Sequence, residues 1–236
     1  MRRLRVFGAG INAAKIVDFI AWQFADTFEV EGFYDDLRPA GAKGPGNLPI
    51  LGTVAQGLDE VPHHDVDAFV ALGTKASARS CEVFLVLHAA GASLPSLVAP
   101  AAHISPSVRL GMNTLVFPGV YFGCEVELGH LCWAHGGTVV EHHTKIGHNV
   151  LFGAAAVIGS FSAVGSHSFF GNGVVTVPEA KIGCGTLVGT GSVVVKELPP
   201  HVIAFGQPAR AIRPVRSGDE VPTKDNVKRL VELGLP

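Results

Sequence analysis

The segment ISPSVR LGMNTL VFPGVY FGCEVE LGHLCW, residues 104–133, divides into five hexapeptides with one pattern. Each begins with an aliphatic or aromatic residue, many have glycine second, and the fifth residue is small or β-branched. The pattern continues without insertion to about Pro199, so that sixteen hexapeptides follow one another. At the first position of these hexapeptides, every residue except Thr176 is apolar. A period of six fits neither a helix nor an alternating strand and predicts a short flat strand followed by a corner.

Three such hexapeptides close one triangular coil, and the stacked coils form a parallel β-helix. We expect the large residue to point inward, the small residue to fit the tight corner, and glycine to permit backbone torsions that a side chain resists. At roughly 4.8 Å per coil the prism is about 25 Å tall. One prism buries little core per residue, so a symmetric homotrimer is expected.

A different pattern precedes the prism and predicts an α/β domain with a small Rossmann-like parallel sheet over residues 1–98. We expect strands at Leu4 to Phe7, Phe28 to Tyr34 and Asp67 to Leu72, and helices at Ala13 to Phe24 and Lys75 to Ala90. A Gly-rich and Pro-rich loop spans Pro39 to Pro49.

The turn after the first strand and the acidic pair after the second are candidate substrate-binding elements. A Gly-x-Gly turn before a helix can present backbone N–H groups to phosphate, and a carboxylate after the next strand can meet a ribose. The residues are Gly8, Gly10, Asn12, Asp35 and Asp36. The third glycine of the dinucleotide fingerprint is replaced by Ala13, so a purely structural turn is the alternative.

Composition excludes several classes of protein. Apolar residues make up 47% of the chain and charged residues 16%, which is typical of a packed globular protein. The formal charge is −2, and Lys and Arg do not cluster, so nucleic acid is not expected as a partner. No apolar run is long enough for membrane insertion. The four cysteines lack CxxC pairing, which favours reduced thiols and a cytoplasmic location.

The order of segments resembles one family. GFYDD (32–36), LPILG (48–52), LPSLVAPAAHISP (94–106), the hexapeptides and GQPAR (206–210) together resemble the sialic-acid O-acetyltransferase-like sugar acyltransferases, which include the nucleotide-amino-sugar N-acetyltransferases. The resemblance implies that residues 99–213 form a left-handed β-helix acyltransferase domain. Residues 214–236 lie outside it, as a tail with a short helix from Asp225 to Leu233.

The resemblance also implies a reaction. The first domain holds the nucleotide-linked amino sugar, and acetyl-CoA, the acyl donor, lies along the prism between adjacent subunits; no metal is expected. A histidine after Val-Glu is the general base, which in VVEHHTKIG (139–147) is His142. Imidazole can accept a proton at neutral pH and return it to the leaving thiolate. The residues assigned to CoA binding are Gly153, Ser160, Asn172 and Gly191.

Three positions depart from the family pattern around this base. His143 stands where an Asp or Glu orients the imidazole, Leu151 replaces a second histidine, and His135 replaces an Asn. His135 and His143 are therefore candidate catalytic residues that could line the same cleft. A non-nucleotide or hydroxyl acceptor, or a binding protein that has lost catalysis, remains an alternative.

The remaining histidines of the prism suggest a minor alternative. His130 and His148 are separated by three hexapeptides and should stack, and the spacing from His130 to His135 occurs in γ-class carbonic-anhydrase-like metal enzymes. No prism histidine occupies an inward position, so we expect His148 and His167 to face outward at the surface or a subunit interface.

Overall fold

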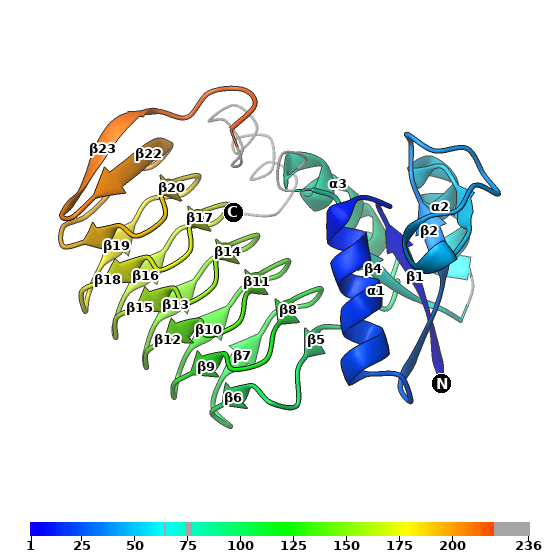
Figure 1. The fold of residues 1–236 in the computed structure, drawn as a ribbon, viewed down its shortest axis with the longest axis horizontal. Coiled ribbons are helices and arrows are strands. Elements are labelled where there is room, and N and C mark those ends of the chain that lie inside the picture. Colours follow the sequence, from blue (N-terminus) through cyan, green and yellow to red (C-terminus); the bar gives the residue numbers. More distant parts are fainter. Residues whose placement is uncertain (64, 74–76, 220–236) are drawn as a thin grey trace. The chain divides into compact units, whose positions relative to one another are not determined.

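The computed structural model describes residues 1–63, 65–73 and 77–219, and the chain forms two compact units, with the boundary between Pro95 and Ser96 (Figure 1). Residues 97 and 98, at the end of the expected first domain, belong to the second unit because Leu97–Val98 pairs with Leu115–Val116. Each unit has its own sheet system and its own core.

Unit 1 is a four-stranded parallel sheet with helices. The strand order is β3-β2-β1-β4, with β1 at Arg2–Phe7, β2 at Phe28–Tyr34, β3 at Ile50–Gly52 and β4 at Asp67–Val70. The helices are α1 at Ile11–Gln23, α2 at Val54–Glu60 and α3 at Ser77–Ala89, with 3-10 turns at Pro45–Asn47 and Val61–His63. Leu4, Val6 and Phe7 of β1 are fully buried, and α1 turns Ile16, Phe19 and Ile20 inward.

The expected elements of unit 1 are present, except that the start of the helix expected from Lys75 lies outside the described residues, and two further elements appear. Strand β3 has three residues and helix α2 has seven, which is too short for hydrophobic periodicity to be visible. Helix α2 begins with a capping box in which the side chains of Thr53 and Gln56 each accept from the other's backbone N–H. Thr53 and Gln56 were therefore the sequence signal for α2.

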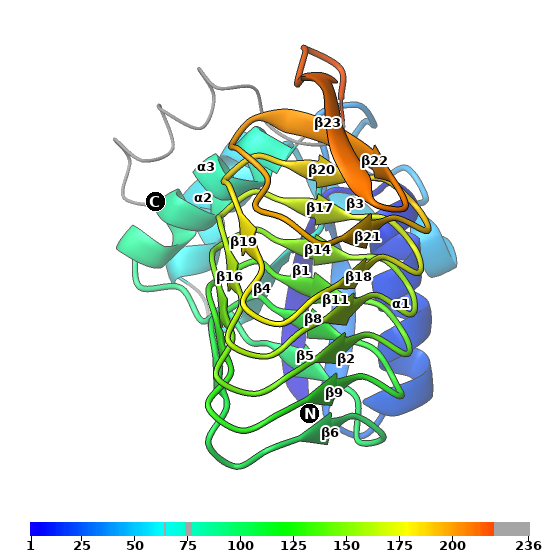
Figure 2. The same cartoon turned by 90° about the vertical axis from the view of Figure 1, so that its left-hand side faces the viewer.

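Unit 2 is a parallel β-helix whose strands form three faces (Figure 2). Face 1 consists of β5 (Leu97–Val98), β8 (Leu115–Val116), β11 (Trp133–Ala134), β14 (Leu151–Phe152), β17 (Phe169–Phe170), β20 (Leu187–Val188) and β22 (Val202–Gly206). Face 2 consists of β6 (His103–Ile104), β9 (Tyr121–Phe122), β12 (Val139–Val140), β15 (Val157–Ile158), β18 (Val175–Thr176) and β21 (Val193–Val194). Face 3 consists of β7 (Arg109–Leu110), β10 (Glu127–Leu128), β13 (Lys145–Ile146), β16 (Ala163–Val164) and β19 (Lys181–Ile182).

Each strand of a face pairs in parallel with the strand at the same place on the next coil, as Glu127 does with Lys145. The first residue of each hexapeptide points into the prism, where Phe122, Phe152 and Phe170 are fully buried and the last two stack at 5.2 Å. The predicted fold class, a small parallel-sheet domain followed by a β-helix, is confirmed.

Glycine serves the prism differently from the expectation. The left-handed backbone conformation lies at the fourth residue of every hexapeptide from residue 113 to residue 191, including the non-glycine residues Asn113, His143 and Phe161. Glycine at the second position instead allows close approach, since a Cβ on Gly165 would overlap the backbone nitrogen of Cys184 on the next coil. The choice of residue at the second position is therefore limited by the space for a side chain, and at the fourth position by the positive φ of the backbone.

The fifth residue is small and often polar because it ties its coil to the next one. The hydroxyls of Thr138, Thr144 and Ser168 donate to the carbonyls of Gly153, Gly159 and Gly183 at 3.1–3.3 Å. The Cys132 thiol donates to the Gly147 carbonyl at 3.2 Å in the same way. Burial raises the pKa of Cys132 to about 12, so this thiol stays protonated and able to donate.

The prism ends in a hairpin, because β22 pairs antiparallel with β23 at Ala209–Pro214. The helix expected from Asp225 to Leu233 lies outside the described residues. Within the described ranges, no helix combines the length and apolar character needed to cross a bilayer.

The two roles of glycine give a testable difference in stability. Gly165→Ala should lower the free energy of unfolding by about 1–3 kcal/mol, because the added methyl group meets backbone atoms that cannot rotate away. Gly173→Asn should cost far less, because Gly173 has open space around its Cβ position and Asn tolerates its positive φ of 65°. Urea unfolding at one protein concentration measures both, and equal losses would contradict this division of roles.

Candidate active site

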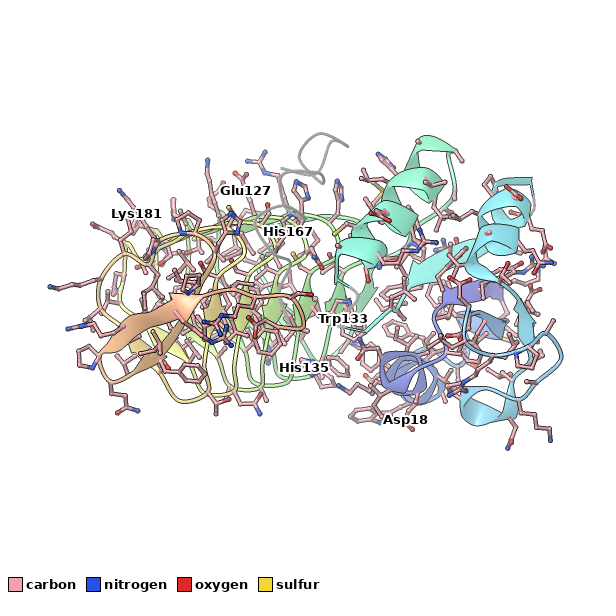
Figure 3. The ribbon with its side chains drawn as sticks, turned by 90° about the horizontal axis from the view of Figure 1, so that it is seen from above. Asp18, Glu127, Trp133, His135, His167 and Lys181 are labelled. Atoms are coloured by element: carbon pink, nitrogen blue, oxygen red, sulfur yellow. The ribbon has the colours of Figure 1, made fainter. Side chains whose placement is uncertain are left out.

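Three corners connect the faces, and the predicted catalytic residues are divided between two of them. Corner A leads from face 1 to face 2, corner B from face 2 to face 3, and corner C from face 3 back to face 1. His142 and His143 follow β12 and lie at corner B, whereas His135 follows β11 and lies at corner A. Figure 3 shows His135 on the side of the prism opposite Glu127 and Lys181, which project from face 3.

His142 and His143 form a contacting pair of imidazoles. Their Nδ1 atoms are 3.1 Å apart, and the ring planes are nearly perpendicular with centroids 5.3 Å apart. His143 is exposed and His142 is half-buried. Corner B therefore presents one ring to solvent with a second ring held at its Nδ1 atom.

Phe161 completes this cluster and was not anticipated from the sequence. It occupies the position of His143 on the next coil, and its ring centroid is 5.1 Å from each of the two imidazole centroids. Its side chain is 55% exposed, and its φ of 57° is unusual for a bulky residue. The positive φ belongs to the fourth hexapeptide position in general, so it is the exposure of a large aromatic ring against two imidazoles that sets Phe161 apart. Counting three hexapeptides forward from each candidate histidine would have found it.

The residues assigned to CoA binding also separate by corner. Ser160 lies at corner B, one coil after His142, whereas Gly153, Asn172 and Gly191 lie at corner A with His135. At corner A the His135 ring stacks on Phe117 at 4.9 Å, and the Asn172 Oδ1 accepts from the backbone N–H of Ala154 at 2.9 Å. Within one chain, His142, His143 and Ser160 come together, and His135 does not join them.

A shallow groove of about 490 Å³ runs along face 3 and reaches corner C, where Gly147, Gly165 and Gly183 line it. Lys145, Ala163 and Lys181 line it on three successive coils, with Cys184 and Glu197 at one end. Lys145 belongs to the same coil as His142. The groove thus combines two ammonium groups with a small apolar side chain between them and begins on the coil that carries the histidine pair.

In unit 1 the acidic pair holds the loops at the carboxyl ends of the strands. Asp35 accepts from the backbone N–H of Ala9 at 2.8 Å and of Leu37 at 2.9 Å, and Asp36 accepts from the N–H of Val54 at the start of α2. The Asn12 amide donates to the carbonyl of Leu72 at 3.3 Å. Asp35 and Asn12 therefore shape the turn around Gly8, where φ is 102°, and Asp36 holds the start of α2.

The N-terminus of α1 is the open part of this turn. Its N-cap, Gly10, supplies no side-chain cap, and a Cβ placed there would meet nothing within 4 Å. The first backbone N–H groups of a helix without a cap can bind an anion. The turn of unit 1 has the chemistry required for a phosphate.

The histidines at corner C hold the coils together. The Nδ1 of His130 accepts from the Met112 N–H at 2.9 Å, the Nδ1 of His148 accepts from the His130 N–H at 3.0 Å, and the hydroxyl of Ser166 accepts from the His148 N–H at 3.1 Å. The predicted stacking of His130 on His148 is confirmed, with centroids 5.0 Å apart. Among the described residues, no group of three His, Cys, Asp or Glu side chains could hold a metal ion.

The expectation that His167 faces outward was wrong. Its side chain is 1% exposed, because it turns along the stack of coils and places Nδ1 3.1 Å from the Asn149 amide. His148 is half-buried. The position of a residue in the hexapeptide predicts whether its side chain points into the prism. It does not predict whether other side chains cover a residue at a corner.

Comparison with known proteins identifies chains of the same fold. PerB from Caulobacter crescentus, solved in complex with CoA and GDP-perosamine, is 28% identical with a TM-score of 0.79, and the match covers 89% of this chain and 97% of PerB. A histidine-to-alanine variant of the GDP-perosamine N-acetyltransferase from the same organism matches at 27% identity with a TM-score of 0.80, over 89% of this chain and 97% of that one.

The acetyltransferase domain of PglB from Neisseria gonorrhoeae, at 24% identity and a TM-score of 0.79, shares the fold over 90% of this chain and all of that domain. No family model matches the sequence, and no curated protein does. The predicted resemblance to the sugar acyltransferases, and the predicted enzyme class, are confirmed by the structural matches.

The corner C ladder predicts a pH dependence of stability. Burial lowers the pKa of His148, so the folded protein keeps this ring neutral at pH values where the unfolded chain already binds a proton. Unfolding then takes up a proton, and the contribution of His148 to stability is lost as the pH falls below about 6.5.

His148→Ser should make the melting temperature less sensitive to acid between pH 7.5 and 5.5, because serine can accept the His130 N–H as Ser166 does on the next coil. His103→Ser, at an exposed histidine, controls for the loss of an imidazole as such. Parallel curves for His148→Ser and the native protein would contradict the role assigned to His148.

Proposed function

We propose that the protein transfers an acetyl group from acetyl-CoA to the amino group of a nucleotide-linked sugar, with His142 as general base, in the cytoplasm. The observation that carries the proposal is the exposed His142–His143 pair at corner B, on a chain with the fold of a GDP-perosamine N-acetyltransferase. The solved complex of that relative holds CoA and GDP-perosamine together.

The reaction needs one group that accepts and returns a proton. The neutral amine attacks the thioester carbonyl, so that a C–N bond forms as the amine proton moves to the Nε2 of His142. The C–S bond then breaks, and His142 gives the proton to the departing thiolate, which leaves as CoA-SH. Imidazole suits both transfers because its ordinary pKa is close to neutral pH. No covalent acyl-enzyme is required.

The face 3 groove supports the assignment of the donor. CoA is an elongated molecule with phosphates at one end and the thioester at the other. Lys145 and Lys181 carry positive charge along a groove that begins on the coil of His142. Ammonium groups bind phosphate as point charges, so this groove can hold the phosphates while the thioester reaches corner B.

The turn at Gly8 and Gly10 supports the assignment of the acceptor. Uncapped backbone N–H groups at the start of α1 suit a pyrophosphate, and Asp35 holds the turn open through Ala9. In this proposal Gly8, Gly10 and Asn12 border the nucleotide, Asp35 positions the turn through Ala9, and Asp36 holds the neighbouring start of α2.

A homotrimer would bring the two functional corners together. After His103 on the first coil, the outward residues of face 2 are Tyr121, Val139, Val157, Val175 and Val193, and those of face 3 are Arg109, Glu127, Lys145, Ala163 and Lys181. Face 2 is uncharged over five coils, with Tyr121 43% and Val175 39% exposed. Corners A and B border this face, so three copies packed through face 2 around an axis would set corner B of one copy against corner A of the next. His135, Gly153 and Asn172 would then reach His142 from the neighbouring copy.

Replacement of the proposed base gives the direct test. His142→Ala should lower kcat/KM by roughly 10²- to 10⁴-fold, the usual contribution of a general base. The assay is mass-spectrometric detection of acetylated product from acetyl-CoA and a panel of nucleotide-linked amino sugars, with the corresponding hydroxyl sugars in parallel. His88→Ala, at an exposed histidine on α3 of unit 1, is the control. Undiminished turnover by His142→Ala would remove the assignment, and acetylation of the hydroxyl sugars alone would correct the acceptor.

The trimer has its own test. The native protein should sediment with three times the mass of the 24.6 kDa chain, and the double variant Val157→Glu with Val175→Glu should sediment as a monomer because two carboxylates would be buried in the interface. Ala163→Glu, on face 3, is the matched control for mass and should remain trimeric. A native protein that stays monomeric at micromolar concentration would contradict the proposal.

A further inference from the structure

We infer that His143 is a positioning residue that holds His142 in the tautomer needed for catalysis, and that it does so as a neutral hydrogen-bond acceptor. The inference rests on the proposed role of His142 as base. It begins from the 3.1 Å contact between the two Nδ1 atoms, which is the one side-chain hydrogen bond of either ring in the described part of the chain.

The contact requires complementary protonation. Two nitrogen atoms 3.1 Å apart form a hydrogen bond when one carries a proton and the other a lone pair. Two protonated Nδ1 atoms would point N–H groups at each other, and two bare ones would oppose their lone pairs. The pair therefore holds one proton between the two Nδ1 atoms.

The reaction decides which ring donates. A neutral His142 that accepts the amine proton at Nε2 must carry its own proton on Nδ1. His142 Nδ1–H then donates to His143, whose proton lies on Nε2. After the transfer the His142 imidazolium still carries Nδ1–H and still donates to the same lone pair, so the contact persists through the reaction.

The fold holds the His143 ring by backbone geometry and aromatic packing. His143 is at a fourth hexapeptide position with φ of 56°, and its N–H donates to the Cys124 carbonyl on the preceding coil at 2.9 Å. Phe161 lies over the ring from the next coil, with centroids 5.1 Å apart and planes 31° apart. His143 is therefore held between two coils, with its Nδ1 directed at His142.

The charged and titratable groups nearby do not replace this acceptor. On the coils stacked against the pair they are Cys124 and Glu125 before it, Glu141 and Lys145 on its own coil, and Glu179 on the coil after Phe161. In the described structure none of these side chains is hydrogen-bonded to either ring. A proton on His143 therefore has no alternative arrangement that keeps the contact with His142.

A distinctive pH dependence follows. A carboxylate partner would accept from His142 throughout the range in which imidazole titrates, so one proton would abolish activity. With His143 as partner, the first proton binds to either ring and disables the pair, and a second proton binds only at lower pH because two adjacent cations repel each other. The acid limb of the kcat profile should thus steepen from one proton to two as the pH falls, whereas it keeps a slope of one proton in a variant whose partner does not titrate there.

Two measurements test the proposal. In the native protein, ¹⁵N NMR of labelled histidines should show His142 protonated at Nδ1 and His143 at Nε2 at pH 8, with each ring assigned from His142→Ala and His143→Ala. This readout does not depend on activity, so failure to find an acceptor sugar would leave it intact. The opposite tautomers, or two rings with independent tautomers, would overturn the proposal.

The kinetic arm compares three variants. His143→Asn can keep the positive φ and accept through its amide oxygen. It should therefore retain most of kcat, and the low-pH end of its acid limb should be one proton shallower than in the native protein. His143→Ala should lose roughly 10- to 100-fold in kcat with little change in the KM for acetyl-CoA, because the base is no longer oriented. Glu125→Gln, on the preceding coil, should keep the native slope.

Equal losses in His143→Asn and His143→Ala would show a structural role for His143 and overturn the proposal. An unchanged slope in His143→Asn would do the same.

Discussion

The close stacking of successive coils is the constraint on which the second unit depends. Adjacent coils approach so tightly that a Cβ on Gly165 would enter the backbone of the next coil. The fourth residue turns left-handed to close each corner, and the fifth donates to the coil above, as Thr144 does to Gly159. A single insertion would break all three relations at once, because each is defined by a fixed separation along the sequence. The uninterrupted repeat is thus a physical requirement.

The same stacking arranges the functional groups in columns. Phe161 lies over His143 and Ser160 follows His142 because the members of each pair are one coil apart, and His130 lies on His148 for the same reason. Chemically identical side chains then acquire different roles from their corners. At corner C the imidazole Nδ1 atoms are used to bind backbone N–H groups, whereas at corner B they face each other. The rings at corner B are therefore the ones suited to proton transfer.

The site combines a conventional scaffold with an unusual partner for its base. The chain has the fold and segment order of acetyltransferases of known structure, yet the residue after His142 is an imidazole where the family resemblance implies a carboxylate. A neutral acceptor orients the base without adding negative charge, and it loses this ability when protonated. The left-handed backbone of the corner and the Phe161 ring hold the His143 side chain in place.

The sequence by itself determined the prism and the strand–helix order of unit 1, because these follow from periodicities within a short stretch of chain. The choice of His142 as candidate base came from the family resemblance. The sequence also showed that His130 and His148 stack, since that needs only a separation of one full coil.

The sequence could not reveal β3 and α2, which are too short to show a period. Nor could it show that His167 is buried or that Asp35 accepts from Ala9. These features depend on side-chain direction and on contacts between distant segments, which the tertiary structure alone decides. The pairing of His142 with His143 belongs to the same class, since adjacent residues in an extended chain point apart and meet here because His143 adopts the left-handed conformation of a corner.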